Sequence, residues 1–250
     1  MFIKICGITS DKDIEYVNKS GADFAGMVLY FPKSKRNISI MRAAKLKKLL
    51  TEDIKAVAVT VSPDLNQVIS IRDAGFSYIQ IHGELSKEVI DFIKNSGNAD
   101  VEMPDTRKIN LVRAYNQVGS VELKEIEMLR EMDRTYAFLF DAKEPGSGSR
   151  FDWNNIPDRN ILKKPYFLSG GLTPDSVAEA ITEVNPDGVD VSSGVELSDA
   201  DARTLAGFIG ISSLTDELLY GENHTRQSDV SMKDFDKIKT FVKNARECGG

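Results

Sequence analysis

Eight short apolar segments rich in β-forming residues recur along this 250-residue chain, each separated from the next by a helix-length stretch. Most are apolar on both faces, as in the run from Ala56 to Val59, which is typical of buried parallel strands. Consecutive segments start 21 to 32 residues apart, about the length of one β-loop-α-loop unit. The repeat therefore predicts an α/β fold of eight parallel strands. The segments are 2–6, 23–29, 55–61, 78–82, 109–114, 136–141, 165–169 and 188–191.

The stretches between these segments carry helical patterns. Val177, Ala180, Ile181 and Val184 follow the spacing of one helix face, and a similar apolar stripe runs through 235–245. Both stripes predict helices that pack on the sheet.

Two motifs predict where helices begin. In 62–64 and 173–175, a side chain able to cap a helix (Ser62, Thr173) precedes a proline and an acidic residue. This order is typical of a helix start, with the proline at the first helical position.

Eight such units predict a closed (βα)₈ (TIM) barrel forming one domain over 1–250. The competing architecture is an open doubly wound sheet. It would more often show a Gly-x-Gly-x-x-Gly turn after an early strand, and the turn at 6–9 lacks it. Two segments exceed the regular pattern: a polar stretch at 97–108, and an insertion at about 197–231 before the last helix. We expect the insertion to add a helix to the barrel rim; the alternative is a surface that contacts another chain.

Composition narrows the classes of partner. Lys and Arg number 32 against 38 Asp and Glu, a net charge of −6, without a basic run that could follow a phosphate backbone. Nucleic acid and anionic membranes are therefore poor partners, and no stretch approaches the roughly 18 apolar residues of a membrane span. The two cysteines, Cys6 and Cys248, are too few for a disulfide framework. We expect a soluble, unprocessed, cytoplasmic protein.

Active sites of such barrels lie at the carboxyl ends of the strands, and two reactive side chains stand there. Cys6 closes the first strand, although position alone favours a buried cysteine that acts as a small apolar residue. Asp141 ends an otherwise apolar run, where core packing does not explain a carboxylate. Burial would raise the pKa of Asp141 towards that of a general acid, and we favour this role over that of a loop cap.

Two glycine-bearing turns follow the last two strands. Gly170 and Gly171 come after the seventh strand, and Ser192, Ser193 and Gly194 come after the eighth. Loops at these places in (βα)₈ barrels frequently bind phosphate through backbone N–H groups. Either turn alone could be only a tight turn, but the pair predicts a small, phosphorylated ligand.

Three further residues are candidates for contact with a ligand. Arg36, in the loop after the second strand, could hold a ligand carboxylate, although most loop arginines are only solvated. His82 ends the fourth strand, where a lone histidine is more often a hydrogen-bonded barrel residue than a base. His224 lies in the insertion, and without a third ligand a histidine-based metal site is not expected.

Several segments, taken in order, resemble the phosphoribosylanthranilate isomerases of tryptophan biosynthesis. The resemblance spans most of the chain, and its most specific parts are the first and the last of the segments. They are Lys4–Thr9, Ser34–Arg36, Gln80–Gly83, Val112–Ala114, Phe140–Asp141 with Pro145–Gly148 and Phe151–Trp153, Ser169–Leu172, and Asp190–Glu196.

The resemblance implies a cofactor-free and metal-free Amadori rearrangement of N-(5-phosphoribosyl)anthranilate to 1-(2-carboxyphenylamino)-1-deoxy-D-ribulose 5-phosphate. It implies that Asp141 is the general acid and Cys6 the general base, and that Arg36 binds the anthranilate carboxylate. The phosphate would lie at the turns of 170–171 and 192–194. The expected state is a monomer or a homodimer.

Two alternatives remain at this point. One is a phosphosugar isomerase of broader substrate range; such enzymes usually work with two aspartates, so Cys6 argues against it. The other is a non-catalytic barrel that binds a phosphorylated ligand or a partner through 197–231. Retention of both the thiol and the carboxylate disfavours it.

Overall fold

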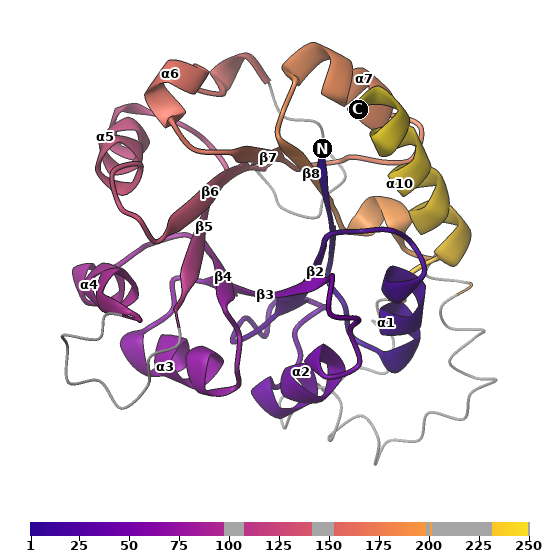
Figure 1. The fold of residues 1–250 in the computed structure, drawn as a ribbon, viewed down its shortest axis with the longest axis horizontal. Helices are drawn as coiled ribbons and strands as arrows, with labels where there is room; N and C mark the ends of the chain where they lie inside the picture. Colours follow the sequence, from indigo (N-terminus) through magenta and orange to yellow (C-terminus); the bar gives the residue numbers. More distant parts are fainter. Residues whose placement is uncertain (98–107, 142–152, 199–200, 202–231, 250) are drawn as a thin grey trace.

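The computed structural model describes residues 1–97, 108–141, 153–198, 201 and 232–249. Its eight strands are all parallel and close into a barrel in chain order, with β1 paired to β8 (Figure 1). The strands are β1 Phe2–Cys6, β2 Phe24–Val28, β3 Lys55–Val61, β4 Tyr78–His82, β5 Asn110–Tyr115, β6 Thr135–Phe140, β7 Tyr166–Leu168 and β8 Gly188–Val191. The predicted barrel is therefore confirmed, and the ends of each strand lie within one residue of the predicted segment.

Helices surround the barrel. They are α1 Asp11–Asn18, α2 Ile40–Lys47, α3 Leu65–Asp73, α4 Lys87–Asn95, α5 Ser120–Leu129, α6 Arg159–Leu162, α7 Val177–Val184 and α10 Phe235–Cys248, with 3₁₀ turns η1 Trp153–Asn155 and η2 Ser193–Val195. The predicted stripe of α7 is buried except at its last residue, and α10 buries Ile238, Phe241, Val242 and Ala245. Most of the large core lies between the barrel and these helices.

The two predicted helix starts were placed too early. Helix α3 is capped by Asp64, whose side chain accepts from the N–H of Gln67, while Ser62 adopts a positive φ of 46°. Helix α7 begins after Ser176. The Thr173 side chain accepts from the N–H of Ser176, and the N–H of Thr173 donates to the Ser176 hydroxyl, so Thr173 caps the turn before the helix. In both loops the proline lies in the turn that leads into the helix rather than at the first helical position.

Alternation along the strands divides the barrel interior into layers. At the amino end, aromatic rings of Phe2, Phe24, Tyr78, Tyr136 and Phe167 pack mostly edge to face with centroids 5.1–6.2 Å apart. Two of these rings, Phe24 and Phe167, belong to the apolar cluster of the barrel interior that also contains Cys6 from β1. The amino end is thus closed by rings, which leaves the carboxyl ends of the strands for a ligand.

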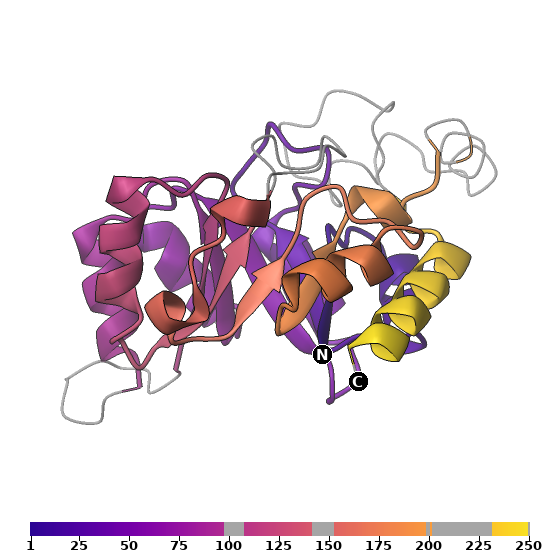
Figure 2. The same ribbon diagram turned by 90° about the horizontal axis from the view of Figure 1, so that it is seen from above.

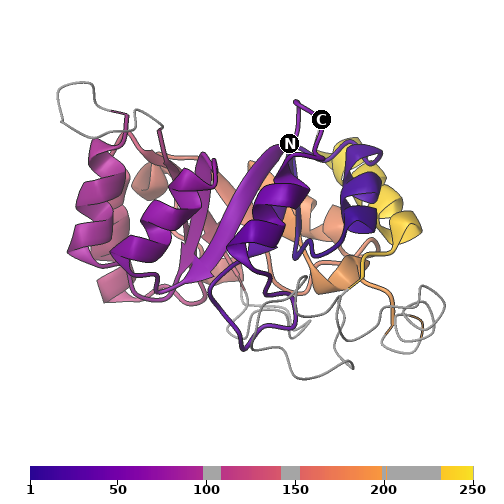
Figure 3. The same cartoon turned by 90° about the horizontal axis from the view of Figure 1, so that it is seen from below.

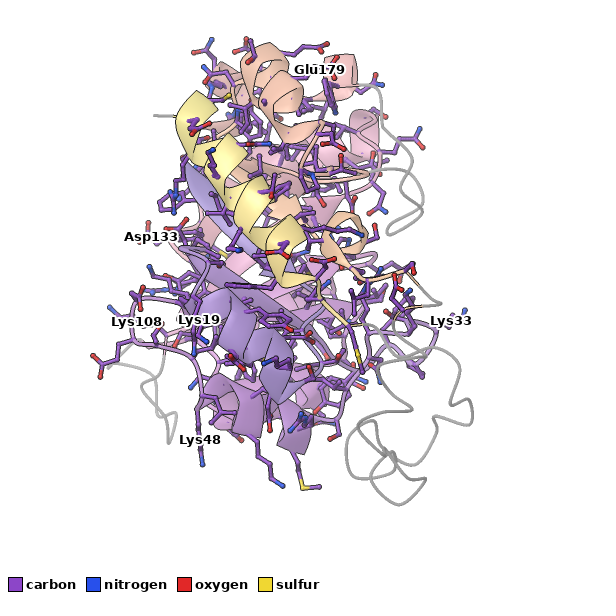
Figure 4. The ribbon with its side chains drawn as sticks, turned by 90° about the vertical axis from the view of Figure 1, so that its right-hand side faces the viewer. Lys19, Lys33, Lys48, Lys108, Asp133 and Glu179 are labelled. Carbon is purple, nitrogen blue, oxygen red and sulfur yellow. The ribbon has the colours of Figure 1, made fainter. Side chains whose placement is uncertain are left out.

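Helix α10 holds the C-terminal end of the chain against the N-terminal end. It packs against α7 and α1 (Figure 4), and Arg246 near its end donates to the carbonyls of Met1 and Gly21. The termini consequently lie side by side at the amino end of the barrel, and η2 lies at the opposite end (Figures 2 and 3). No helix in the described part of the chain is both long and apolar enough to span a bilayer. Nearly all of the expected insertion at 197–231, and most of the polar stretch at 97–108, lie outside the described residues.

Candidate active site

Cys6 lies in the barrel interior beside charged side chains of β1 and β8. The side chain is 7% exposed and lies on the inward face of β1, two residues after Lys4. Lys4 is also buried, and its ammonium donates to Asp190 of β8 at 2.9 Å. Burial raises the pKa of the Cys6 thiol, and the neighbouring Lys4 ammonium opposes that rise. Cys6 is therefore buried in an apolar cluster, as position alone predicted, but the Lys4–Asp190 ion pair also lies beside it.

Asp141 occupies the matching position on β6. It follows Ala137 and Leu139 at alternate positions, so its side chain shares their inward face, and it is 7% exposed. Its N–H donates to the carbonyl of Tyr115 at 2.9 Å, which fixes it to the end of β5. The loop that follows, at 142–152, lies outside the described residues. The carboxyl group thus faces the same barrel mouth as the thiol.

The two glycine-bearing turns lie against each other. Gly170 and Gly171 have φ of 88° and 66°, a conformation that a residue with a Cβ rarely adopts. A Cβ on Gly194 would collide with the carbonyl of Leu172, so the two turns are in direct contact. They form one continuous edge at the ends of β7 and β8.

The second turn also contacts the end of β1. The Ser192 hydroxyl donates to the carbonyl of Cys6 at 3.1 Å. Gly7, with φ of 78°, lies between this hydroxyl and the side chain of Arg36, both of which a Cβ on Gly7 would strike. Ser169, at the start of the first turn, donates its N–H to Phe140. The predicted site residues therefore line one arc that runs from β6 through β7, β8 and β1 to the loop after β2.

Arg36 is held by a carboxylate of this chain. Its Nε and Nη2 donate to the two oxygens of Glu196 at 2.5 and 3.0 Å, and the side chain is 13% exposed. A guanidinium has five N–H donors, so this pair leaves the Nη1 edge for a ligand. Position alone favoured a solvated arginine, but Arg36 is ordered at the mouth by its pair with Glu196.

Glu196 receives two more cations. Lys35 lies 3.4 Å from it, and Lys233, just before α10, donates to it at 3.1 Å. The Lys233 side chain is fully buried and also donates to the carbonyl of Ser192 at 3.0 Å. Its N–H donates to Asp13. Lys233 therefore ties the chain after the insertion to the turn at 192–194.

His82 is not available as a base in this structure. Asn116 Oδ1 can only accept, so the 3.4 Å contact places the ring proton on Nδ1. Nε2 then accepts from the Gln80 amide at 2.8 Å. Burial lowers the pKa of His82 to about 4, which favours this neutral ring. His82 is thus the hydrogen-bonded barrel residue that its position favoured.

Four charged residues of the site had no predicted role: Lys4, Asp190, Glu196 and Lys233. Three of them stand inside the motifs that carry the resemblance, so the motifs already marked them. Lys233 had no signal, because a lysine just before a helix is ordinarily a solvated residue.

Comparison with known proteins identifies relatives of this chain. Residues 3–200 match the family model described as N-(5'phosphoribosyl)anthranilate (PRA) isomerase. The N-(5'-phosphoribosyl)anthranilate isomerase of Streptococcus mutans is 35% identical over 195 residues, which cover 78% of this chain and 89% of that protein.

Solved structures agree with this match. Monomers derived from the dimeric phosphoribosylanthranilate isomerase of Thermotoga maritima superpose with a TM-score of 0.69 at 29% identity, covering 99% of both chains. A phosphoribosylanthranilate isomerase in complex with reduced 1-(o-carboxyphenylamino)-1-deoxyribulose 5-phosphate gives 0.68, with the same identity and coverage.

Proposed function

The chain belongs to the family of N-(5'-phosphoribosyl)anthranilate isomerases, and we propose that Cys6 and Asp141 are the base and the acid with which it isomerises that substrate. The reaction is the Amadori rearrangement to 1-(2-carboxyphenylamino)-1-deoxy-D-ribulose 5-phosphate, a step of tryptophan biosynthesis. One observation carries the assignment: a thiol and a carboxyl group, both buried, face the carboxyl end of one barrel from β1 and β6.

Each group has a distinct step. Asp141, as the acid, gives its proton to the ribose ring oxygen, and the bond from that oxygen to C1′ breaks to leave a Schiff base. Cys6, as thiolate, then removes the C2′ proton. The resulting enolamine takes up a proton at C1′ and loses one from the C2′ hydroxyl to give the ketone. The acid and the base stand three strand positions apart around the barrel, so the sugar would lie between them.

The binding contacts follow from the same arc. The Nη1 edge of Arg36 would hold the anthranilate carboxylate in charge-assisted hydrogen bonds. The touching turns at 170–171 and 192–194 would hold the phosphate, since their backbone N–H groups lie at strand ends where (βα)₈ barrels bind phosphate.

The proposal also covers the setting of the enzyme. We place it in the cytoplasm as one domain over 1–250, acting as a monomer or homodimer on a small phosphorylated substrate without a nucleic acid or membrane partner. The two free cysteines support the cytoplasmic location. A solved relative that is dimeric supports the homodimer.

The test is an assay that follows loss of phosphoribosylanthranilate fluorescence with purified protein. Cys6→Ser and Asp141→Asn should each lower kcat by at least about 10²-fold while the far-ultraviolet circular dichroism stays unchanged. Cys248→Ser is the matched control, because that thiol is exposed at the end of α10, and it should keep full activity. Near-normal kcat in Cys6→Ser would show that another group is the base.

Arg36→Ala tests the carboxylate contact separately. It should act mainly on KM, because the lost interaction holds a part of the substrate that does not react. An unchanged KM would remove this role from Arg36.

A further inference from the structure

Lys4 is a buried cation that the steps above do not use. Its side chain and that of Asp190 are 4% and 5% exposed, and the ion pair they form lies inside the barrel. Desolvating two such charges costs several kcal/mol each before their attraction is counted, so a buried pair is poor evidence for stability alone. An apolar pair of similar size would fill the same space, which suggests a functional reason for the charges.

The ammonium of Lys4 lies beside the sulfur of Cys6. Both side chains point inward from β1, and Gly26 of β2 pairs with Cys6. A Cβ on Gly26 would lie 2.7 Å from the Cys6 sulfur and 3.0 Å from the Lys4 nitrogen. The two atoms are therefore at most about 5.7 Å apart, the sum of these distances, which lies within the roughly 4–6 Å over which an opposite charge favours the ionised form of a group. The absence of a side chain at 26 leaves the space that they occupy.

The other charged groups near the thiol come from two further elements. Asp190 of β8 disfavours the thiolate, and the buried Lys233 before α10 favours it less strongly than Lys4 does. His82 of β4 is neutral, and Gly26 of β2 brings no charge. Lys4 is thus the strongest favourable charge that faces the sulfur, and Asp190 fixes its direction.

We propose that Lys4 is a positioning residue for the reaction, whose ammonium, held by Asp190, stabilises the thiolate form of Cys6. This inference rests on the proposed role of Cys6 as the base. A thiolate is the form that can accept the C2′ proton, and in a buried site an adjacent cation favours its formation. Lys4 keeps its own proton throughout, since Asp190 and Cys6 help raise its pKa to about 12.

The test measures ionisation of the thiol directly, without substrate. In a Cys248→Ser background, the ultraviolet absorbance of the thiolate is followed across pH. Lys4→Met should raise the thiol pKa by about 1 to 3 pH units, the usual effect of an adjacent opposite charge. Lys4→Arg keeps the positive charge, so the thiol pKa should stay close to that of the parent. Lys55→Met removes a lysine at the amino end of β3 and should change nothing.

A second variant keeps the test decisive if Lys4→Met does not fold. Lys4→Gln combined with Asp190→Asn replaces the ion pair with two amides that can bond each other. The thiol pKa should still rise, because Lys4 affects it more than Asp190 does. A pKa unchanged in the variants that fold would overturn the inference.

Turnover separates this inference from the proposed function. If both hold, the acidic limb of the pH profile of kcat/KM moves in Lys4→Met by the same amount as the thiol pKa. Turnover retained in Cys6→Ser overturns the base assignment but leaves the titration result standing. An unchanged titration with inactive Cys6→Ser overturns only the role of Lys4.

Discussion

Arg36, Lys35 and Lys233 share the carboxylate of Glu196, and this arrangement allows a quantitative prediction about the free energy of unfolding. Glu196→Gln would leave the fully buried Lys233 ammonium without its counter-charge. Breaking a buried pair in this way costs about 3–5 kcal/mol. Lys233→Met should cost less, about 1–3 kcal/mol, because Glu196 keeps both bonds to Arg36 and the main loss is the bond to the Ser192 carbonyl.

The variant that combines Glu196→Gln with Lys233→Met measures the coupling energy between the two residues. With Lys233 already replaced, Glu196→Gln no longer strands a buried cation, so the combined loss should fall short of the sum by about 1–3 kcal/mol. The free energy of unfolding is measured from urea titrations followed by circular dichroism. Lys237→Met is the matched control: Lys237 donates to the backbone carbonyl of Glu196, which Glu196→Gln retains, so these two changes should add. Additivity within about 0.5 kcal/mol for the Lys233 pair would refute the reasoning.

Three other predictions concern His82 and Gly194 at the mouth of the barrel and Arg113 on the outer face of β5. The folded chain holds the pKa of His82 at about 4 rather than 6.5, so the unfolded chain binds more protons between those pH values. The free energy of unfolding should therefore fall by up to about 3 kcal/mol as pH drops through this window. His82→Gln should remove that part of the pH dependence in urea titrations. Gly194→Ala would force its Cβ onto the Leu172 carbonyl and separate the two turns, so the KM for substrate should rise and the affinity for inorganic phosphate, measured calorimetrically, should fall; unchanged affinity would place the phosphate elsewhere. Arg113→Met would strip hydrogen bonds from three backbone carbonyls and from Glu125, at a cost on the order of 3 kcal/mol in unfolding free energy, and a loss below about 1 kcal/mol would show that water replaces them.

The barrel could be predicted from the sequence because its signals are local. Each strand is a run of a few apolar residues, and the helices of 177–184 and 235–248 show their buried stripes directly. Helix starts were less certain, since Ser62 and Asp64 are both good caps and only packing decides between them. The motifs located Cys6 and Asp141 because strand ends follow from strand positions.

The charge network could not be predicted in this way. Lys4 and Asp190 are 186 residues apart in the chain and meet only because β1 pairs with β8. Lys233 meets Ser192 across 41 residues that include the insertion. Such contacts depend on closure of the barrel and on the path of the last helix. A periodic pattern of apolar residues in the sequence predicts neither of these.

One short segment supplies the counter-charges of Lys4, Arg36 and Lys233. Within 190–196, Asp190 orients Lys4 beside the thiol, and Glu196 orients Arg36 and Lys233. The turn proposed for phosphate lies between these two acids, and its first residue bonds the backbone of Cys6. The proposed positions for the base, the anthranilate carboxylate and the phosphate are therefore set by one stretch of backbone. A substitution that shifts it should alter thiol ionisation and both binding contacts together, whereas Asp141, on β6, should keep its place.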